Sequence, residues 1–364
     1  MKYTYLEGLR GYMSLWVLLY HASCFLPSVN TKNVFLDFFT NASLPVIVFM
    51  ILSGFVTHIL LQKNENYFFY LKRRAFRIFP IYLICFVASL LLLKFYLNTL
   101  EEIPFDSPKI YGRIKQIETY YNSSDKILNI ISHLTLSHGI FPESRFPFTY
   151  SIMGQSWSLT LEWQFYIFIP FLYYFLNKKN RIQNAFLLLF FLVVMYISKT
   201  HHINQPSFLP NMIIYFLIGY FSLPLYKKFE TSNNYCVFVF LSVICLVYLF
   251  FNWEISCLIL LWGVVLFFQN NNNFLSDILL GSKIPQFLGK ISYSIYCTHM
   301  IVLACLLALL QCIEINYGLY FSISMLFGGM FLTILISHYS YHYIELYFIN
   351  LAKTKNSSKE GQTH

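Results

Sequence analysis

Residues 43–62 read SLPVIVFMILSGFVTHILLQ, and this stretch contains no Asp, Glu, Lys or Arg. A helix of about 20 apolar residues is as long as the hydrocarbon core of a bilayer is thick. Similar runs recur along the chain, which is 57% hydrophobic and only 11% charged. A soluble domain carries about 25% charged residues, so this composition excludes an ordinary water-soluble protein. We therefore predict an all-α, polytopic helix bundle in a membrane.

About ten runs are long and apolar enough to be transmembrane helices. If the N-terminus lies in the cytoplasm, most Lys and Arg residues fall in inner segments, as the positive-inside rule requires. The formal charge of +9 is then explained by topology, without a nucleic-acid partner. Both termini are expected in the cytoplasm. The predicted spans are 9–27, 43–62, 77–97, 155–176, 184–199, 208–226, 234–251, 254–269, 288–311 and 319–345.

We expect a single transmembrane domain over residues 1–350 and a polar, disordered tail over 351–364. The segment 98–154 is the largest extramembrane piece and is predicted to face outward, with a short helix near 125–138. It is long enough to form a lid or to shape an acceptor site. The eight cysteines lie in or beside apolar runs and include no CxxC pair, so neither a disulfide framework nor a metal site is expected.

The first predicted span carries two ionisable side chains, Arg10 and His21. Eleven residues of α-helix make about three turns plus 20°, so both side chains point the same way, about 16 Å apart along the axis. Ionisable residues inside a span are costly and are typically functional. The alternatives are an arginine that anchors the helix at lipid headgroups and a histidine that makes a helix-packing hydrogen bond.

A basic cluster, Lys72-Arg73-Arg74 followed by Arg77, lies at the start of the third predicted span. Arg74 and Arg77 are three residues apart and share a helix face. Arginine binds phosphate bidentately, so the cluster suits the phosphates of a nucleotide. The alternative is a positive-inside signal in contact with anionic lipid.

Further polar residues lie inside or beside other spans. Ser53 and Gly54 permit either close helix packing or a ligand contact. Glu162 lies in an apolar run, where a carboxyl group should pair with a cation, as the structural partner of an arginine would, or titrate with a raised pKa. Glu345 lies at the inner end of the last span, where it could meet the arginine cluster. We also single out Trp157 and Ser158 in the fourth span and Tyr293 and His299 in the ninth.

These blocks, in this order, resemble acyltransferase family 3, the bacterial integral membrane O-acyltransferases that modify surface glycans. Each block alone is weak, but six in order over residues 6 to 345 are a specific signature. The blocks are Gly8-Leu9-Arg10-Gly11 with His21, Leu52-Ser53-Gly54-Phe55, Arg73-Arg74 with Arg77 and Pro80, Trp157-Ser158-Leu159 with Glu162, Gln164, Phe165 and Tyr166, Gly289 to His299, and Ile344-Glu345.

The resemblance implies an acyl-CoA-dependent O-acyltransferase in the bacterial cytoplasmic membrane. Its donor would be a cytoplasmic acyl-CoA, with acetyl as the expected group. Its acceptor would be a hydroxyl group of a surface glycan, such as the O-antigen of lipopolysaccharide, or of its lipid-linked precursor. The expected partners are therefore acyl-CoA, the glycan and membrane lipid. No tightly bound cofactor, metal or nucleic acid is expected.

Within this hypothesis, His21 would act as general base on the acceptor hydroxyl, or take the acyl group itself as a covalent relay. Arg10 would hold a donor phosphate or stabilise an oxyanion. Glu162 would orient a cation or the acceptor hydroxyl. The donor phosphates would bind Arg73, Arg74 and Arg77.

The roles of His299 and Glu345 stay open, although both belong to the motif blocks. The rival hypothesis is a membrane transporter or flippase without acyl transfer, because transporters also place Arg, His and Glu inside their spans. A transporter is expected to have repeat-related halves, and the sequence shows no strong internal repeat.

Overall fold

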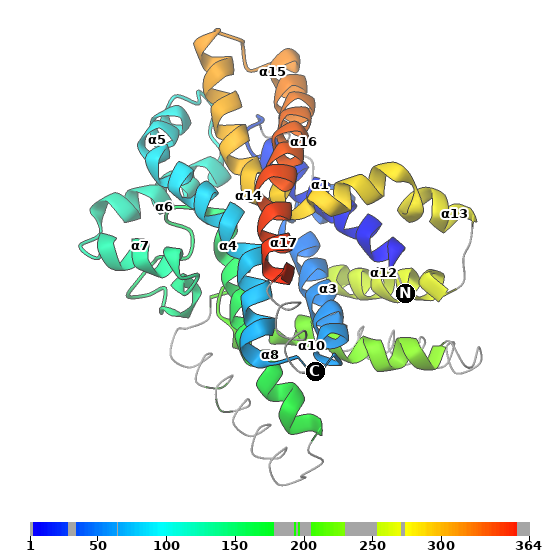
Figure 1. Ribbon diagram of the computed structural model, residues 1–364. Coiled ribbons are helices and arrows are strands. Elements are labelled where there is room, and N and C mark those ends of the chain that lie inside the picture. The colour runs from blue at the N-terminus through cyan, green and yellow to red at the C-terminus, as the bar shows by residue number, and fades with distance from the viewer. Residues whose placement is uncertain are drawn as a thin grey trace. The chain divides into compact units, whose positions relative to one another are not determined.

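The computed structural model describes residues 3–27, 34–63, 65–177, 205–229, 253–270 and 274–354, together with Val193 and Tyr196. Within these residues the regular secondary structure is entirely helical, without a β-strand (Figure 1). The all-α prediction is confirmed for this part of the chain. Five helical segments are long and apolar enough to cross a membrane: Ser43–Leu61, Tyr67–Leu91, Leu209–Lys227, Phe274–Cys312 and Leu319–Lys353.

These five segments correspond to the predicted second, third, sixth, ninth and tenth spans. Helices also occupy the regions of the first, fourth and eighth predicted spans, although they do not meet the same criteria of length and apolarity. The fifth and seventh predicted spans lie outside the described residues, apart from Val193 and Tyr196. The chain is thus a multi-pass helical membrane protein, while the total of ten spans and the cytoplasmic termini stay predictions.

The described residues form two compact units, and the first unit combines the N-terminal helices with Tyr215–Tyr296. Its elements are α1 (Thr4–Ser23), α2 (Val34–Phe39), α3 (Ser43–Leu61), the part of α10 (Leu209–Phe229) from Tyr215, α12 (Trp253–Asn270), α13 (Phe274–Ser276), the π-helical turn η3 (Asp277–Gly281) and the part of α14 (Lys283–Cys312) up to Tyr296.

Glycines form the closest helix contacts of this unit. A Cβ atom on Gly289 of α14 would lie only 2.0 Å from the carbonyl oxygen of Glu7 in α1. A Cβ atom on Gly8 would lie 2.1 Å from the carbonyl oxygen of Leu280 in η3. Helix α1 therefore lies against η3 and α14 with the backbones in contact (Figure 1). Small residues permit this close approach, which stabilises helix pairs inside a membrane.

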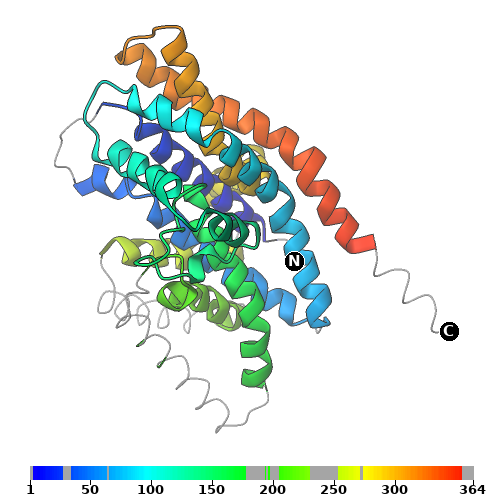
Figure 2. The same cartoon turned by 90° about the vertical axis from the view of Figure 1, so that its left-hand side faces the viewer.

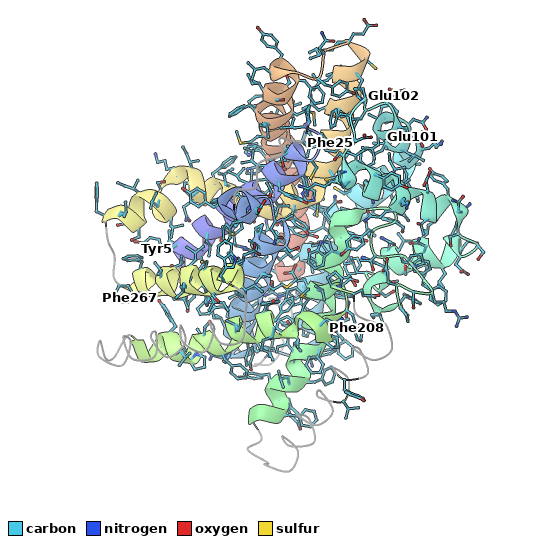
Figure 3. The ribbon with its side chains drawn as sticks, turned by 180° about the vertical axis from the view of Figure 1, so that it is seen from behind. Tyr5, Phe25, Glu101, Glu102, Phe208 and Phe267 are labelled. Carbon is cyan, nitrogen blue, oxygen red and sulfur yellow. The ribbon has the colours of Figure 1, made fainter. Side chains whose placement is uncertain are left out.

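Hydrogen bonds also join the start of α1 to α12, η3 and α14. The main-chain N–H of Tyr5, a residue labelled in Figure 3, donates to Gln269 of α12 over 3.0 Å, and the Tyr5 hydroxyl donates to Asp277 of η3. The side-chain amide of Gln286 donates to the carbonyl oxygen of Thr4 over 2.6 Å. The first turn of a helix has main-chain groups without helical partners. In α1 the surrounding elements supply such partners.

The second unit combines Leu61–Ile214 with Cys297–His364 and the short segment Cys24–Ser28. Besides its parts of α10 and α14, its elements are α4 (Tyr67–Leu91), α5 (Leu93–Glu101), α6 (Pro108–Asn122), α7 (Lys126–Leu134), the 3-10 turns η1 (His138–Ile140) and η2 (Gly154–Ser156), α8 (Trp157–Asn177), α15 (Leu319–Ile323), the π-helical turn η4 (Ser324–Gly328), α16 (Gly329–Ser340), the π-helical turn η5 (Tyr341–Glu345) and α17 (Leu346–Thr354).

Helix α4 lies at the centre of the contacts in this unit. It packs against α8, against α7, and against η5 and α17, which run beside it (Figure 2). Three sequence blocks that are far apart in the chain, those of Arg73, Glu162 and Glu345, are therefore carried by neighbouring elements.

Two helix boundaries differ from the predicted ones. Helix α4 begins at Tyr67, because Asn66 caps it by accepting a hydrogen bond of 2.9 Å from the main-chain N–H of Phe68. The arginine cluster consequently lies inside α4, which begins ten residues before the predicted third span and ends at Leu91. Helix α17 continues to Thr354, so the predicted polar tail is helical at its beginning.

The segment between α5 and α8 is more helical than predicted. Helix α7 corresponds to the short helix expected near 125–138. Helix α6 was not predicted, although it has a typical start: Ser107 caps the main-chain N–H of Ile110, and Pro108 is the first helical residue.

The contact between α1 and α14 makes a prediction about stability. Gly289→Ala should destabilise the protein by about 1–3 kcal/mol, because the added methyl group overlaps the main chain of Glu7 and the helices must separate. Gly112→Ala is the matched control, since a Cβ atom on Gly112 meets nothing within 4 Å and the change should improve helix propensity. Thermal unfolding in lipid nanodiscs measures both. Equal midpoints for the two variants would contradict the contact.

Candidate active site

Helix α1 in the first unit carries both Arg10 and His21 without a break. Their side chains are partly buried. Nδ1 of His21 lies 2.8 Å from the main-chain carbonyl oxygen of Val17, one turn back. A carbonyl oxygen only accepts, so Nδ1 carries a proton and Nε2 is the basic nitrogen of the neutral ring. The imidazole is therefore held in the tautomer whose Nε2 can accept a proton or attack an electrophile.

Arg10 lies between Gly8, which brings α1 close to η3, and Gly11, which brings α1 close to α14. A Cβ atom on Gly11 would lie 2.7 Å from the carbonyl oxygen of Pro285 and 2.9 Å from the main-chain nitrogen of Gly289. The first and fifth sequence blocks thus meet in space, although they lie at opposite ends of the chain. Their glycines determine how closely the helix that carries Arg10 approaches α14.

The Ser53-Gly54 block lies at a second close helix crossing, between α3 and α10. A Cβ atom on Gly54 would lie 1.9 Å from the carbonyl oxygen of Phe216, and one on Gly219 would lie 1.8 Å from that of Ile51. For Gly54, this geometry supports helix packing, one of the two interpretations of the block. Ser53 is partly buried on α3 beside it.

Helix α4 in the second unit carries the three candidate donor-binding residues, Arg73, Arg74 and Arg77. Arg73 forms an ion pair with Glu65, a partner that the sequence did not indicate. The guanidinium group of Arg74 instead lies over the ring of Tyr166 in α8, 4.9 Å from its centroid. The charge of Arg73 is thus largely balanced, whereas Arg74 turns toward the helix that carries the fourth block.

Tyr166 links Arg74 to Glu162. Its hydroxyl group donates a hydrogen bond to the Glu162 carboxylate, while its ring lies below the Arg74 cation. Cation–π contacts contribute about 0.5–2 kcal/mol, more where water is excluded, and Tyr166 is only 3% exposed. Tyr166 follows Glu162 by one helical turn, which places the two side chains on one face. Arg74, Tyr166 and Glu162 therefore form one charged cluster, which we call the α4–α8 cluster.

The fourth block also contacts α14 within the second unit. The side-chain amide of Gln155, just before α8, donates to the carbonyl oxygen of Cys297 over 3.4 Å. His299 follows one half-turn later on α14 and is fully buried. Thr298 shares a hydrogen bond of 3.0 Å with Ser337 of α16. The environment of His299 is thus a buried polar layer between helices.

The structure assigns the sequence-predicted residues to two groups, one in each unit. The first unit holds Arg10, His21, Ser53, Gly54 and Tyr293. The second unit holds Arg73, Arg74, Arg77, Trp157, Ser158, Glu162, His299 and Glu345.

Glu345, Tyr166 and Glu65 of the second unit differ in how far the sequence indicated them. Glu345 is 2% exposed in η5, and this turn packs against α4, which carries the arginines. Tyr166 was not predicted as a site residue, although its position four residues after Glu162 was a usable signal. Glu65 precedes α4 and gave no such signal.

The α4–α8 cluster makes a prediction about coupling. Tyr166→Phe keeps the ring below Arg74 but removes the hydrogen bond to Glu162. Combined with Glu162→Gln in a double-mutant cycle, it should show a coupling free energy of about 1 kcal/mol or more in thermal unfolding. Tyr343→Phe, on an exposed side chain of η5, is the control that should add independently. Additive effects of Tyr166→Phe and Glu162→Gln would disprove the link.

Neither a curated protein nor a solved structure shows significant similarity to the chain. The model of the acyltransferase-domain family, by contrast, matches residues 3–342, which is nearly the whole chain and includes both groups of residues except Glu345. The chain therefore belongs to the acyltransferase 3 family and is a membrane acyltransferase.

Proposed function

We propose that the protein transfers an acyl group, with acetyl as the expected group, from cytoplasmic acyl-CoA to a hydroxyl group of a cell-surface glycan or its lipid-linked precursor. The family match supports acyl transfer in a membrane. The donor, the acceptor and the location in the bacterial cytoplasmic membrane are our proposals from the sequence blocks.

The observation that carries the proposal is the tautomer of His21. Because Nδ1–H is engaged by the carbonyl oxygen of Val17, Nε2 is the nitrogen with a lone pair. Acyl transfer to a hydroxyl group needs such a nitrogen, since an alcohol is a poor nucleophile until a base takes its proton.

We infer that Nε2 of His21 takes the proton of the acceptor hydroxyl while the oxygen attacks the thioester carbonyl carbon. The tetrahedral intermediate then collapses, the carbon–sulfur bond breaks, and the CoA thiolate leaves with the proton from His21. In the covalent variant, Nε2 itself attacks the thioester, the carbon–sulfur bond breaks, and the CoA thiolate leaves. The acceptor oxygen then displaces the imidazole from the acyl-imidazolium while its proton passes to the CoA thiolate. Arg10 would stabilise the oxyanion in either case, or hold a donor phosphate.

In the second unit, the donor phosphates are proposed to bind the arginines of α4. Arg74 is a stronger candidate than Arg73, because Arg73 is ion-paired with Glu65. Phosphate binding by Arg74 would change the charge felt by Glu162 through Tyr166. Glu162 would thereby orient the cation, as one of its two predicted roles requires.

The predicted topology would place the donor and the acceptor on opposite faces of the membrane. Ten spans with both termini in the cytoplasm would place α4 and its arginines at the inner face, where acyl-CoA is made. The segment 98–154, with α6 and α7, would lie at the outer face, where a glycan acceptor arrives.

The test is transfer of radiolabelled acetyl from acetyl-CoA in proteoliposomes that contain the purified protein and extracted lipid-linked glycans. His21→Ala should lower the rate by about 100-fold or more, because a positioned general base contributes that much. His342→Ala is the control, since it removes an exposed histidine of η5. Label that remains on the protein in the absence of acceptor would identify the covalent variant.

Transfer at the normal rate by His21→Ala, in protein that unfolds at the wild-type temperature, would remove His21 from the reaction. Absence of transfer by wild-type protein from acetyl-, succinyl- and longer acyl-CoA would contradict the proposed donor and favour the transporter hypothesis.

A further inference from the structure

A pair of buried histidines lies in the segment between α5 and α8. His133 lies in the last turn of α7, His138 begins η1, and both are fully buried. Their rings stack with centroids 4.1 Å apart and planes inclined by only 7°. Phe86 of α4 also stacks on His133, with centroids 5.5 Å apart. The pair belongs to none of the sequence blocks.

The hydrogen bonds determine the protonation of each ring. Nδ1 of His133 lies 3.0 Å from the carbonyl oxygen of Asn129, so it carries a proton. Ser156 gives its hydroxyl proton to the carbonyl oxygen of Met153 over 2.6 Å. Nε2 of His138, which lies 3.3 Å from the same hydroxyl oxygen, must therefore be the donor of that hydrogen bond. Both rings are neutral, and each keeps one nitrogen without a proton.

Those two nitrogens, Nε2 of His133 and Nδ1 of His138, have no hydrogen-bond partner among the described residues. They cannot share a metal ion, because a metal lies in the plane of each imidazole that binds it and these planes are parallel. A proton on either nitrogen would create a buried cation, which is unfavourable, and on His133 the new N–H would have no partner among the described residues.

The groups around the pair also affect the free energy of protonating the two rings. Tyr82 of α4 donates to the main-chain carbonyl oxygen of His133 over 2.8 Å, and Arg113 of α6 is a cation close enough to disfavour protonation of His133. Ser156 of η2 and Ser132 of α7 place main-chain carbonyl oxygens near His138, which favour its protonated form but do not outweigh burial. None of these contacts within the described chain involves a carboxylate that would stabilise an imidazolium ion.

The pair and its neighbours hold the chain that leads into α8. Arg113 donates to the carbonyl oxygen of Ile152 over 2.8 Å and also to that of Tyr150. Asn129 of α7 donates to Ser151 over 2.9 Å. His138 holds Ser156, the residue immediately before α8. The segment 150–156 is thus fixed from α6, α7 and η1 together, and it sets where Trp157 begins α8.

We propose that His133 and His138 are positioning residues that hold the start of α8, and with it Glu162, only while both imidazoles are neutral. Proton uptake would separate the stacked rings, release Ser156 and loosen residues 150–156. The consequence for acyl transfer rests on the proposed function. The release itself follows from the stack and its contacts.

The direction of the pH dependence follows from the neutral rings. Burial and the neighbouring Arg113 lower the pKa of His133 to about 4, and burial and the adjacent His133 lower that of His138 well below 6.5. In the released segment both pKa values return to about 6.5. The closed form is therefore fully favoured above pH 6.5, and as pH falls from 6.5 toward 4 the released form gains up to about tenfold per pH unit for each histidine.

The test is hydrogen–deuterium exchange of the full-length protein in nanodiscs at pH 7.5 and pH 5, corrected for the intrinsic pH dependence of exchange. Wild-type residues 129–156 should exchange at least tenfold faster at pH 5. His133→Phe, which keeps an aromatic ring on Phe86 and the bond from His138 to Ser156, should show a clearly smaller increase. The double variant with His138→Phe should show almost none.

Two further variants keep the outcome interpretable. His133→Gln keeps a donor for the carbonyl oxygen of Asn129 and replaces His133→Phe if that variant does not reach the membrane. Tyr82→Phe removes a neighbouring hydrogen bond without removing a histidine, so it should keep the wild-type response to pH. Wild-type exchange that is equal at both pH values, or a double variant as acid-sensitive as wild type, would overturn the proposal.

The pH profile of acetyl transfer separates positioning from mere stability. Wild-type transfer should fall more steeply between pH 7 and pH 5 than that of His133→Phe. Identical profiles would show that the pair does not position the site. If exchange responds as expected while no acyl-CoA supports transfer at any pH, the proposed function fails and the acid-sensitive release stands.

Discussion

The contact between the backbones of α1 and α14 is the interaction on which the first unit depends. Lipid chains are as apolar as leucine side chains, so helices in a membrane gain little from hydrophobic burial and much from close packing. Gly11 and Gly289 permit that packing, and Gly8 permits the adjoining contact of α1 with η3. Because α1 is held against α14, the positions of Arg10 and His21 along the α1 axis are held relative to α14 as well. The glycines thus explain why two distant sequence blocks occur together.

The second unit solves a different problem, that of holding charges in apolar surroundings. Arg73 is balanced by Glu65, whereas Arg74 reaches Glu162 through the phenol of Tyr166. A ring between the two charges separates them while keeping them coupled, because the face attracts the cation and the hydroxyl serves the carboxylate. In this arrangement the Tyr166 ring contacts the face of the Arg74 guanidinium group, whereas the N–H groups of that guanidinium point along its edge.

The sequence predicted the helical class and most of the helices, because apolar runs of span length have few other uses. It also predicted that Arg10 and His21 share a helix, since spacing alone determines that. It could not predict the start of α4, which depends on the cap at Asn66 rather than on apolarity. Nor could it reveal the pairing of Arg73 with Glu65 or the stack of His133 on His138, because these contacts join residues whose spacing follows no helical period.

Only the structure distinguishes the glycines of the sequence blocks, which pack helices, from the charged residues of the same blocks. Gly54 and Gly289 have packing explanations, while Glu162 and Arg74 have none that packing requires. A block that looks uniform in sequence is therefore a mixture of residues that place the helices and residues available for chemistry. Family membership by itself does not distinguish the two kinds.

The last long helical segment, Leu319–Lys353, contains two π-helical turns, η4 and η5, between stretches of ordinary α-helix. Each such turn accommodates an extra residue, so the side chains beyond it are rotated about the axis by about 100° relative to those before it. Glu345 is 2% exposed, whereas Tyr343 and Tyr347 on either side of it are 76% and 60% exposed. A helical wheel drawn through Leu319–Lys353 at 100° per residue would therefore place the side chains after each turn about 100° out of position. An insertion or deletion of one residue in either turn would rotate everything that follows by about 100° relative to the segment before it.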